Sequence, residues 1–261
     1  MNAYDKVMAA RDSKRLTAVD YINKMFGSSF IEMHGDRRFG DDKAIVGGLA
    51  MLYDQPITVI GIEKGRNTKE RMNRNFGSAN PEGDRKALRL MKQAEKFHRP
   101  VFCLVDTSGA YPGIGAEERG QGLAIAENLM EMMTLKTPVL SIIIGEGGSG
   151  GALALAVADE VWMLEDSIYS VISPEGCASI LWKDSSKAPE ASNCLKLTSH
   201  DLFDLGVIER IIREPVDSDD RKMFEGLKML VARTFEKNMA VDTDKLIDTR
   251  YARFRKFGKK D

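Results

Sequence analysis

The most constraining feature of this sequence is a glycine-rich run that directly follows an apolar stretch. Five glycines fall within residues 145–151. Residues 139–144 are largely apolar and β-branched, which predicts a buried strand, and Ala152 to Ala158 predict the first turns of a buried helix. Such a junction leaves main-chain N–H groups open at the positive end of a helix. That arrangement suits an anionic oxygen, either on a bound group or developing during a reaction.

A second loop with similar chemistry follows the preceding buried strand. Residues 106–120 contain four glycines and a proline, which predict a tight, shaped loop before a helix. Ligands bind at the carboxyl ends of parallel strands in α/β folds, so we expect the two loops to form one pocket. Glu117 and Glu118 are better explained as acidic residues that favour the start of a helix.

Other interpretations of the glycine run are weaker. Gly145, Gly147 and Gly150 match the dinucleotide-binding pattern, with Glu165 at the usual distance, but the following helix is too short for that fold. No Lys-Ser/Thr pair follows the last glycine, which disfavours a P-loop. Ser149 does not lie in the G-x-S-x-G pattern of a hydrolase nucleophile. Close helix–strand packing explains some of the glycines but does not easily explain all five.

Predicted strands alternate with predicted helices along the chain. The connections contain helices, which favours parallel pairing and an α/β fold. We expect one domain over residues 1–261, with a helical N-terminal segment (1–30), a core (about 30–215) and a helical C-terminal tail (216–261). The main expected strands cover residues 45–52, 57–62, 101–105, 139–144 and 207–212, and the main expected helices cover 81–97 and 117–135.

Composition excludes several classes of protein. The 38 basic residues nearly balance 39 acidic ones, so no overall field draws the chain to nucleic acid or a membrane surface, and no apolar stretch is long enough to span a bilayer. The three cysteines are scattered, which disfavours a metal ribbon or a disulfide framework and indicates a cytoplasmic protein. A basic loop, 64–74, offers Lys64, Arg66 and Lys69 as candidate phosphate contacts, although a solvated loop explains it equally well.

Several sequence blocks are familiar as a set. They are residues 39–42, 64–66, 75–77, 81–83, 85–91, 106–121, 145–155 and 173–183. In this order they resemble the α subunits of bacterial acetyl-coenzyme A carboxylase carboxyltransferases, from about residue 15 to residue 215. The resemblance implies a crotonase/ClpP-like spiral of β-β-α units. It also implies transfer of a carboxyl group from carboxybiotin to acetyl-CoA, which gives malonyl-CoA for fatty-acid biosynthesis.

The resemblance also implies roles for particular residues. The backbone N–H groups of Gly150 and Gly151 form the oxyanion hole for the biotin oxygen, and a valine at Gly151 is expected to abolish turnover while leaving assembly intact. The sequence departs from the family at Ser108, where proline is usual. The residues expected at the substrate are Gly109, Ala110, Tyr111, Gly147, Gly148 and Ser149.

By the same resemblance, this chain acts only with other proteins. A β subunit carries a Cys₄ zinc ribbon and much of the acetyl-CoA site, and the two assemble as an α2β2 heterotetramer. No metal is expected in the present chain. A biotin carboxyl carrier protein delivers carboxybiotin, and a biotin carboxylase consumes the ATP.

Two rival functions belong to different classes. A stand-alone crotonase-like acyl-CoA hydratase or isomerase would need an acid–base carboxylate in the pocket, for which Glu146 and Glu117 are the candidates. A non-catalytic module could instead bind nucleic acid through the basic loop or the basic tail, 250–260.

Overall fold

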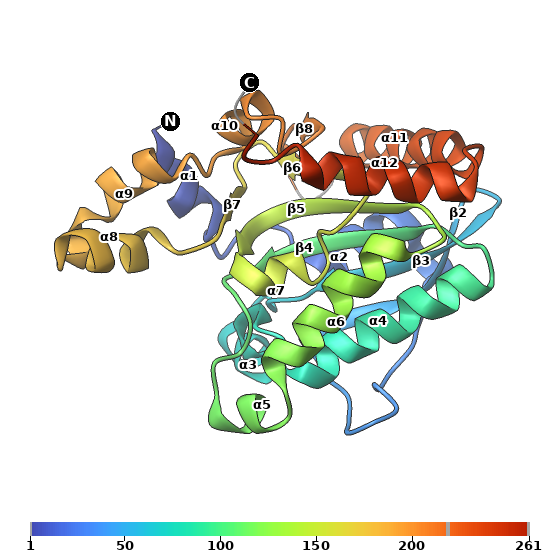
Figure 1. Cartoon of the computed structure of the whole chain (residues 1–261), viewed down its shortest axis with the longest axis horizontal. Coiled ribbons are helices and arrows are strands. Elements are labelled where there is room, and N and C mark those ends of the chain that lie inside the picture. Colours follow the sequence, from blue (N-terminus) through green and yellow to red (C-terminus); the bar gives the residue numbers. More distant parts are fainter. Residues whose placement is uncertain (1, 218–219, 260–261) are drawn as a thin grey trace.

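We analysed a computed structural model of the chain, which describes residues 2–217 and 220–259. Within these residues the chain forms one eight-stranded sheet with the order β1-β2-β3-β4-β5-β6-β8, and β7 pairs with β5 (Figure 1). The strands are β1 (Ile31–Glu32), β2 (Ile45–Leu52), β3 (Gln55–Ile62), β4 (Val101–Thr107), β5 (Val139–Gly148), β6 (Glu160–Leu164), β7 (Ile168–Ser170) and β8 (Arg210–Ile212).

The sheet combines an antiparallel edge with a parallel centre. The pairs β1–β2 and β2–β3 are antiparallel, whereas the pairs β3–β4, β4–β5, β5–β6 and β6–β8 are parallel. The expected strands 45–52 and 57–62 form the hairpin β2–β3, and the expected parallel pairing holds from β3 onward. Together with the helix that follows them, β2 and β3 make a β-β-α unit.

Helices cover both faces of the sheet. Leu90 and Met91, on the inward side of helix α4 (Pro81–Lys96), pack with Ile60 and Cys103 on one face. Phe102 packs on the other face. The helices are α1 (Ala3–Ala10), α2 (Ala18–Phe26), α3 (Thr68–Asn73), α4 (Pro81–Lys96), α5 (Ile114–Glu118), α6 (Gln121–Thr134), α7 (Ser149–Leu153), α8 (Pro174–Trp182), α9 (Ala188–Leu195), α10 (Ser199–Asp204), α11 (Arg221–Met239) and α12 (Thr243–Arg255).

Helix α4 shows why the local sequence forms these elements. Pro81 occupies its first turn, where a missing N–H costs nothing, and Glu82 and Asp84 lie in the same turn. Ala87, Leu90, Met91 and Ala94 then recur at helical spacing and are fully buried. The helix expected over 81–97 is therefore confirmed to within one residue.

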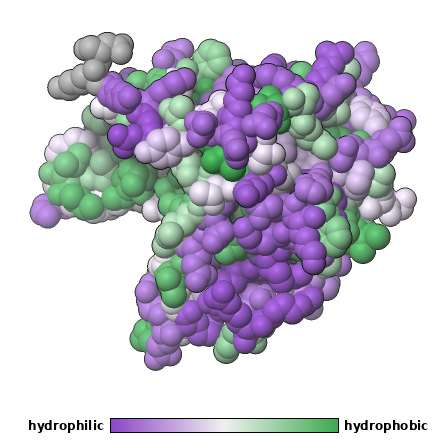
Figure 2. Space-filling view, turned by 45° about the vertical axis from the view of Figure 1, so that its right-hand side comes forward, coloured by the Kyte–Doolittle hydropathy of each residue, from purple (hydrophilic) through white to green (hydrophobic). Residues whose placement is uncertain are grey.

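Helices α1, α8 and α9 form an arm at one end of the molecule (Figure 1). The arm is built on small clusters of its own, one of which joins Val7 and Ala10 of α1 to Ile168 and Leu197. Figure 2 shows hydrophobic residues on the surface at the left, the end at which Figure 1 draws α8 and α9. Three large apolar side chains near or on α8 are more than half exposed: Val171, Ile180 and Leu181.

Several sequence-based boundaries were wrong. The strand expected over 207–212 begins only at Arg210, and the strand expected over 101–105 continues to Thr107. Three other differences lie near the two loops. The helix expected over 117–135 is two helices, because Gly120 adopts a left-handed conformation (φ 84°) between α5 and α6. The strand expected over 139–144 continues as β5 through Gly148. The helix expected from Ala152 to Ala158 is the single turn α7, which starts earlier and ends at Leu153. Among the helices of the described residues, none has both the length and the apolar character that a membrane span requires.

Candidate active site

The carboxyl ends of β4 and β5 bring two segments together, loop 108–120 and the glycine segment 145–151. Strand pairing sets Thr107 beside Gly147. A Cβ atom placed on Gly151 would lie 2.7 Å from the main-chain nitrogen of Ala110. The two segments are therefore in contact, as expected from two neighbouring parallel strands.

Close packing explains more of the glycines than the sequence suggested. A Cβ atom on Gly145 would overlap the Asp106 carboxylate, and one on Gly148 would overlap the carbonyl oxygen of Ser108. At Gly150, by contrast, a Cβ atom would meet only the Ile125 side chain, at an ordinary 3.6 Å. Gly150 is thus the glycine in this segment at which a Cβ atom would meet nothing closer than 3.6 Å.

The first turn of α7 offers main-chain donors beside a cavity. Within the described residues, no hydrogen bond joins the amides of Gly150 or Gly151 to a group outside α7, and the first amides of a helix have no partner inside it. Ser149 and Gly150 line a cavity of about 310 Å³ whose other walls include Leu153, Tyr169 and Phe254. Gly151 is buried behind loop 108–120.

Ser149 holds an unusual conformation at this point. Its φ of 49° lies in the left-handed region that non-glycine residues rarely occupy, and its side chain is exposed. Backbone strain of this kind costs about 1–3 kcal/mol and persists only where the surroundings impose it. The turn from β5 into α7 is therefore fixed by its neighbours.

Loop 108–120 uses part of its own hydrogen-bonding capacity internally. The amide of Gly109 donates to Oγ1 of Thr107 (3.0 Å), and that hydroxyl donates in turn to the Gly109 carbonyl. The amide of Tyr111 donates to the carbonyl of Ala79, and the Tyr111 side chain is partly exposed. The Gly109 and Tyr111 amides are therefore committed, which leaves Ala110 as the loop's amide closest to Gly151.

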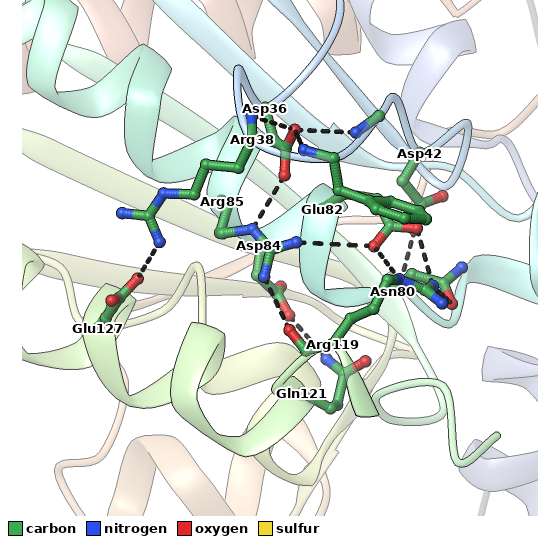
Figure 3. A network of polar contacts seen from close by, with 12 residues as sticks. Asp36, Arg38, Asp42, Asn80, Glu82, Asp84, Arg85, Arg119, Gln121 and Glu127 are labelled. Carbon is green, nitrogen blue, oxygen red and sulfur yellow. Dashed lines mark hydrogen bonds and ion pairs between the residues drawn. The ribbon is translucent and has the colours of Figure 1, made fainter. Parts of the chain in front are cut away.

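The start of α4 holds the far end of this loop (Figure 3). Arg119 donates to both carboxylate oxygens of Glu82, at 3.1 and 3.0 Å. Arg85 donates to the Arg119 carbonyl (3.1 Å), and the side-chain amide of Gln121 donates to the Asp84 carboxyl group (2.9 Å). The residues on both sides of Gly120, Arg119 and Gln121, are thus held by contacts with the start of α4.

Asp84 is an unusual member of this network. Burial is the main cause that raises its pKa to about 8, and the negative charge of Asp42 adds to the rise. Its side chain is therefore largely protonated at neutral pH.

A second polar network lies beneath the glycine segment. Lys64 lies 2.8 Å from both Asp106 and Glu146, and Glu146 also accepts from Arg11 at 2.7 Å. Burial alone would raise the pKa of Glu146, but Lys64 and Arg11 hold that pKa below its usual value. Burial alone would lower the pKa of Lys64, but Asp106 and Glu146 raise it.

These contacts bear on the other residues singled out in the sequence. Lys64 is engaged by two carboxylates, Arg66 pairs with Asp20, and Lys69 is exposed on α3. The three do not converge in this structure, and their contact with a phosphate stays a prediction. Within residues 2–217 and 220–259, no cluster of three or more His, Cys, Asp and Glu residues could hold a metal ion.

Neither carboxylate suggested for a hydratase or isomerase is placed to act as a base inside a pocket. Both oxygens of Glu146 accept from cations, and Glu117 is exposed on α5. Sequence reasoning missed Arg11 and Glu82, which organise the two networks. An arginine at the end of an N-terminal helix carries no local signal of such a role, whereas Asp106 at a strand end was visible as part of the loop.

Solved structures of low sequence identity share the fold of this chain. A Pseudomonas malonate decarboxylase hetero-tetramer in complex with coenzyme A matches with a TM-score of 0.72 at 14% identity, over 92% of this chain and 98% of that chain. Transcarboxylase 12S, with methylmalonyl-coenzyme A bound, matches with a TM-score of 0.68 at 20% identity, over 85% of this chain and 43% of that chain. The fold is therefore the crotonase-like α/β fold of carboxyltransferases, as the resemblance implied.

The sequence itself identifies the family. The family model described as acetyl co-enzyme A carboxylase carboxyltransferase-like matches residues 1–258. The acetyl-coenzyme A carboxylase carboxyl transferase subunit alpha of Ruminiclostridium cellulolyticum is 60% identical over 258 residues, which cover 99% of this chain and 98% of that protein. The chain belongs to the family of acetyl-CoA carboxylase carboxyltransferase α subunits.

Proposed function

We propose that this protein is the α subunit of a carboxyltransferase that moves a carboxyl group from carboxybiotin to acetyl-CoA and forms malonyl-CoA for fatty-acid biosynthesis. The observation that carries the proposal is the pair of main-chain amides, Gly150 and Gly151, at the start of α7, where Gly150 lines a cavity at the carboxyl end of β5. Family membership over nearly the whole chain supports the same reaction.

The proposed chemistry needs donors rather than a side-chain base. The N–carboxyl bond of carboxybiotin breaks and releases CO₂, and the electron pair stays on the ureido group of biotin. That group then takes a proton from the methyl of acetyl-CoA, and the resulting enolate carbon attacks CO₂ to form malonyl-CoA. The amides of Gly150 and Gly151 donate to the ureido oxygen while it carries negative charge. One such donor is worth about 2.7–4 kcal/mol of barrier.

The neighbouring segments supply the pocket for these groups. In the proposal, Gly109, Ala110 and Tyr111 of the loop and Gly147, Gly148 and Ser149 of the glycine segment contact the substrates. Their contact with one another across the β4–β5 edge supports a shared pocket. Lys64, Arg66 and Lys69 are the candidates for the coenzyme A phosphates in this proposal. Lys69 is exposed on α3, whereas Lys64 and Arg66 would have to leave their present ion pairs.

We propose further that the chain works in the cytoplasm as part of an α2β2 heterotetramer. The β subunit supplies the zinc ribbon and much of the acetyl-CoA site, the biotin carboxyl carrier protein brings carboxybiotin, and biotin carboxylase prepares it with ATP. The exposed apolar side chains on the arm support the presence of a protein partner.

The direct test is malonyl-CoA formation by the purified chain, its β subunit and a carboxybiotinylated carrier protein. We expect turnover only when all three are present. A correctly assembled complex that forms no malonyl-CoA would overturn the proposal. Hydration or isomerisation of an enoyl-CoA by the isolated chain would replace it with the stand-alone enzyme.

A further inference from the structure

Glu146 is the charged residue within the glycine segment, and basic side chains contact both of its carboxylate oxygens. Its side chain is 11% exposed. One carboxylate oxygen lies 2.8 Å from Nζ of Lys64, and the other lies 2.7 Å from Nε of Arg11. A carboxylate whose two oxygens both accept from cations is a poor proton acceptor, so its role lies outside proton transfer.

The main chain of Glu146 is anchored by Asp106, which also contacts Lys64. Between two pairs of partners, Val105–Ile143 and Thr107–Gly147, β4 advances by two residues while β5 advances by four. In this irregular stretch the Glu146 amide donates to Asp106 (2.8 Å), and the same Asp106 oxygen lies 2.8 Å from Lys64. Lys64 therefore ties the main chain of Glu146, through Asp106, to its side chain.

Glu146 also stands where the sheet passes into the arm. Residues 140–143 of β5 pair with β6, whereas 146–148 pair with β7. Arg11, on the other side of Glu146, pairs with Glu175 of α8 at 2.7 Å. The residue thus fixes the last part of β5 against both the core and the arm.

We infer that Glu146 is a positioning residue for carboxyl transfer, because its pairs with Lys64 and Arg11 fix the end of β5 and thereby set the amides of Gly150 and Gly151 at the start of α7. The inference rests on the proposed function, since the exact place of these amides matters only if they receive charge in the reaction. A misplacement of about 1 Å in such a group lowers the rate by about 100-fold.

The test is Glu146→Gln in the complete complex with the β subunit and carboxybiotinylated carrier. Glutamine keeps the shape and removes the charge. We expect kcat to fall by about 100-fold while KM for acetyl-CoA changes little, since the loop side of the pocket is untouched. Glu146→Asp keeps the charge but shortens the side chain, and we expect it to recover part of kcat.

Asp159→Asn is the matched control. Asp159 forms a buried pair with Arg250 (2.8 Å) and accepts from the amide of Val139 at the opposite end of β5. We expect this variant to lower the thermal midpoint and leave kcat near wild type. If Glu146→Gln does not assemble, Arg11→Gln removes one of the two pairs of Glu146, together with the pair to Glu175, and keeps the pair with Lys64, so we expect a smaller fall in kcat.

The outcomes separate the two proposals. Full kcat in an assembled Glu146→Gln complex would overturn the positioning role and leave the proposed function standing. A rise in KM with unchanged kcat would also overturn it, because Glu146 would then act on substrate binding. Absence of malonyl-CoA formation by the wild-type complex would instead refute the proposed function itself.

Discussion

Loop 108–120 and the glycine segment 145–151 lie side by side, but different forces hold them. The loop has side chains of its own, and Arg119 anchors it to the first turn of α4. The glycine segment has few side chains, so its shape comes from direct backbone packing against the loop and from the buried charges around Glu146. A segment that must present bare amides cannot stabilise itself, and its neighbours do so instead.

The largest effect that would break this contrast is expected from a side chain at Gly151. Its Cβ atom would approach the Ala110 nitrogen to 2.7 Å. We therefore expect Gly151→Val to lose turnover. We also expect it to lower the free energy of unfolding by about 1–3 kcal/mol or more, the cost typical of overpacking. This corrects the expectation that valine at this position leaves the assembly intact.

Gly150→Ala is the matched control for that prediction. Its Cβ atom has ordinary contact with Ile125, so urea unfolding should give a free energy close to wild type. Equal destabilisation by both variants would show that close packing does not distinguish the two glycines.

An effect that depends on pH is expected at Asp84 in the network that holds the loop. Its pKa is about 8 in the folded chain against an ordinary 3.8. The folded state therefore favours the protonated form, and the stability this provides is full below pH 3.8 and is lost as the pH rises towards 8.

Asp84→Asn removes this titration and still accepts from Gln121. The unfolding free energy of the variant should gain on wild type by up to about 1.4 kcal/mol per pH unit over that range and level off above it. Denaturant unfolding at several pH values measures the difference. A difference that does not change with pH would contradict a protonated Asp84.

A change at Arg119 sharpens the comparison in kinetic terms. Arg119→Gln releases Glu82 and loosens loop 108–120, whereas the glycine segment keeps its own supports. We expect KM for acetyl-CoA to rise more than kcat falls, the reverse of Glu146→Gln. Arg38→Gln is the control, because the Arg38 side chain donates to Glu127 (3.4 Å) at the margin of the network in Figure 3.

The smallest effect is expected from Ser108→Pro, which introduces the proline that the family resemblance leads us to expect at this position. Thr107 is in strand β4, and an extended residue before proline is favourable. We expect a gain of about 0.4–1 kcal/mol in the unfolding free energy and an unchanged kcat. A loss of stability would show that the Ser108 amide or conformation is needed.

The sequence predicted the elements whose signals are local. Helix α4 follows from its proline and its apolar spacing, and the central strands follow from their apolar runs. The site's location follows from two glycine-bearing loops after neighbouring strands, and the family follows from blocks in a fixed order. The extension of β5 through Gly148 was missed because glycine disfavours strands, and here Tyr169 and Ser108 pack against the bare positions.

The contacts between distant residues were not predictable. Arg11 and Glu146 are 135 positions apart, and nothing in the spacing of either residue indicates the other. The same holds for Arg119 and Glu82, which are 37 positions apart. Periodicity reports which face of an element is buried, but the partner of a buried charge is decided only when the elements pack.

The change of neighbours along β5 has a consequence for how the molecule opens. Residues 140–143 pair with β6, and residues 146–148 pair with β7, although the Glu146 amide itself donates to Asp106. If the arm detaches while the core stays folded, deuterium enters the amides that donate to β7 before those that donate to β6. One strand thus contains an internal reporter that distinguishes loss of the arm from loss of the whole fold.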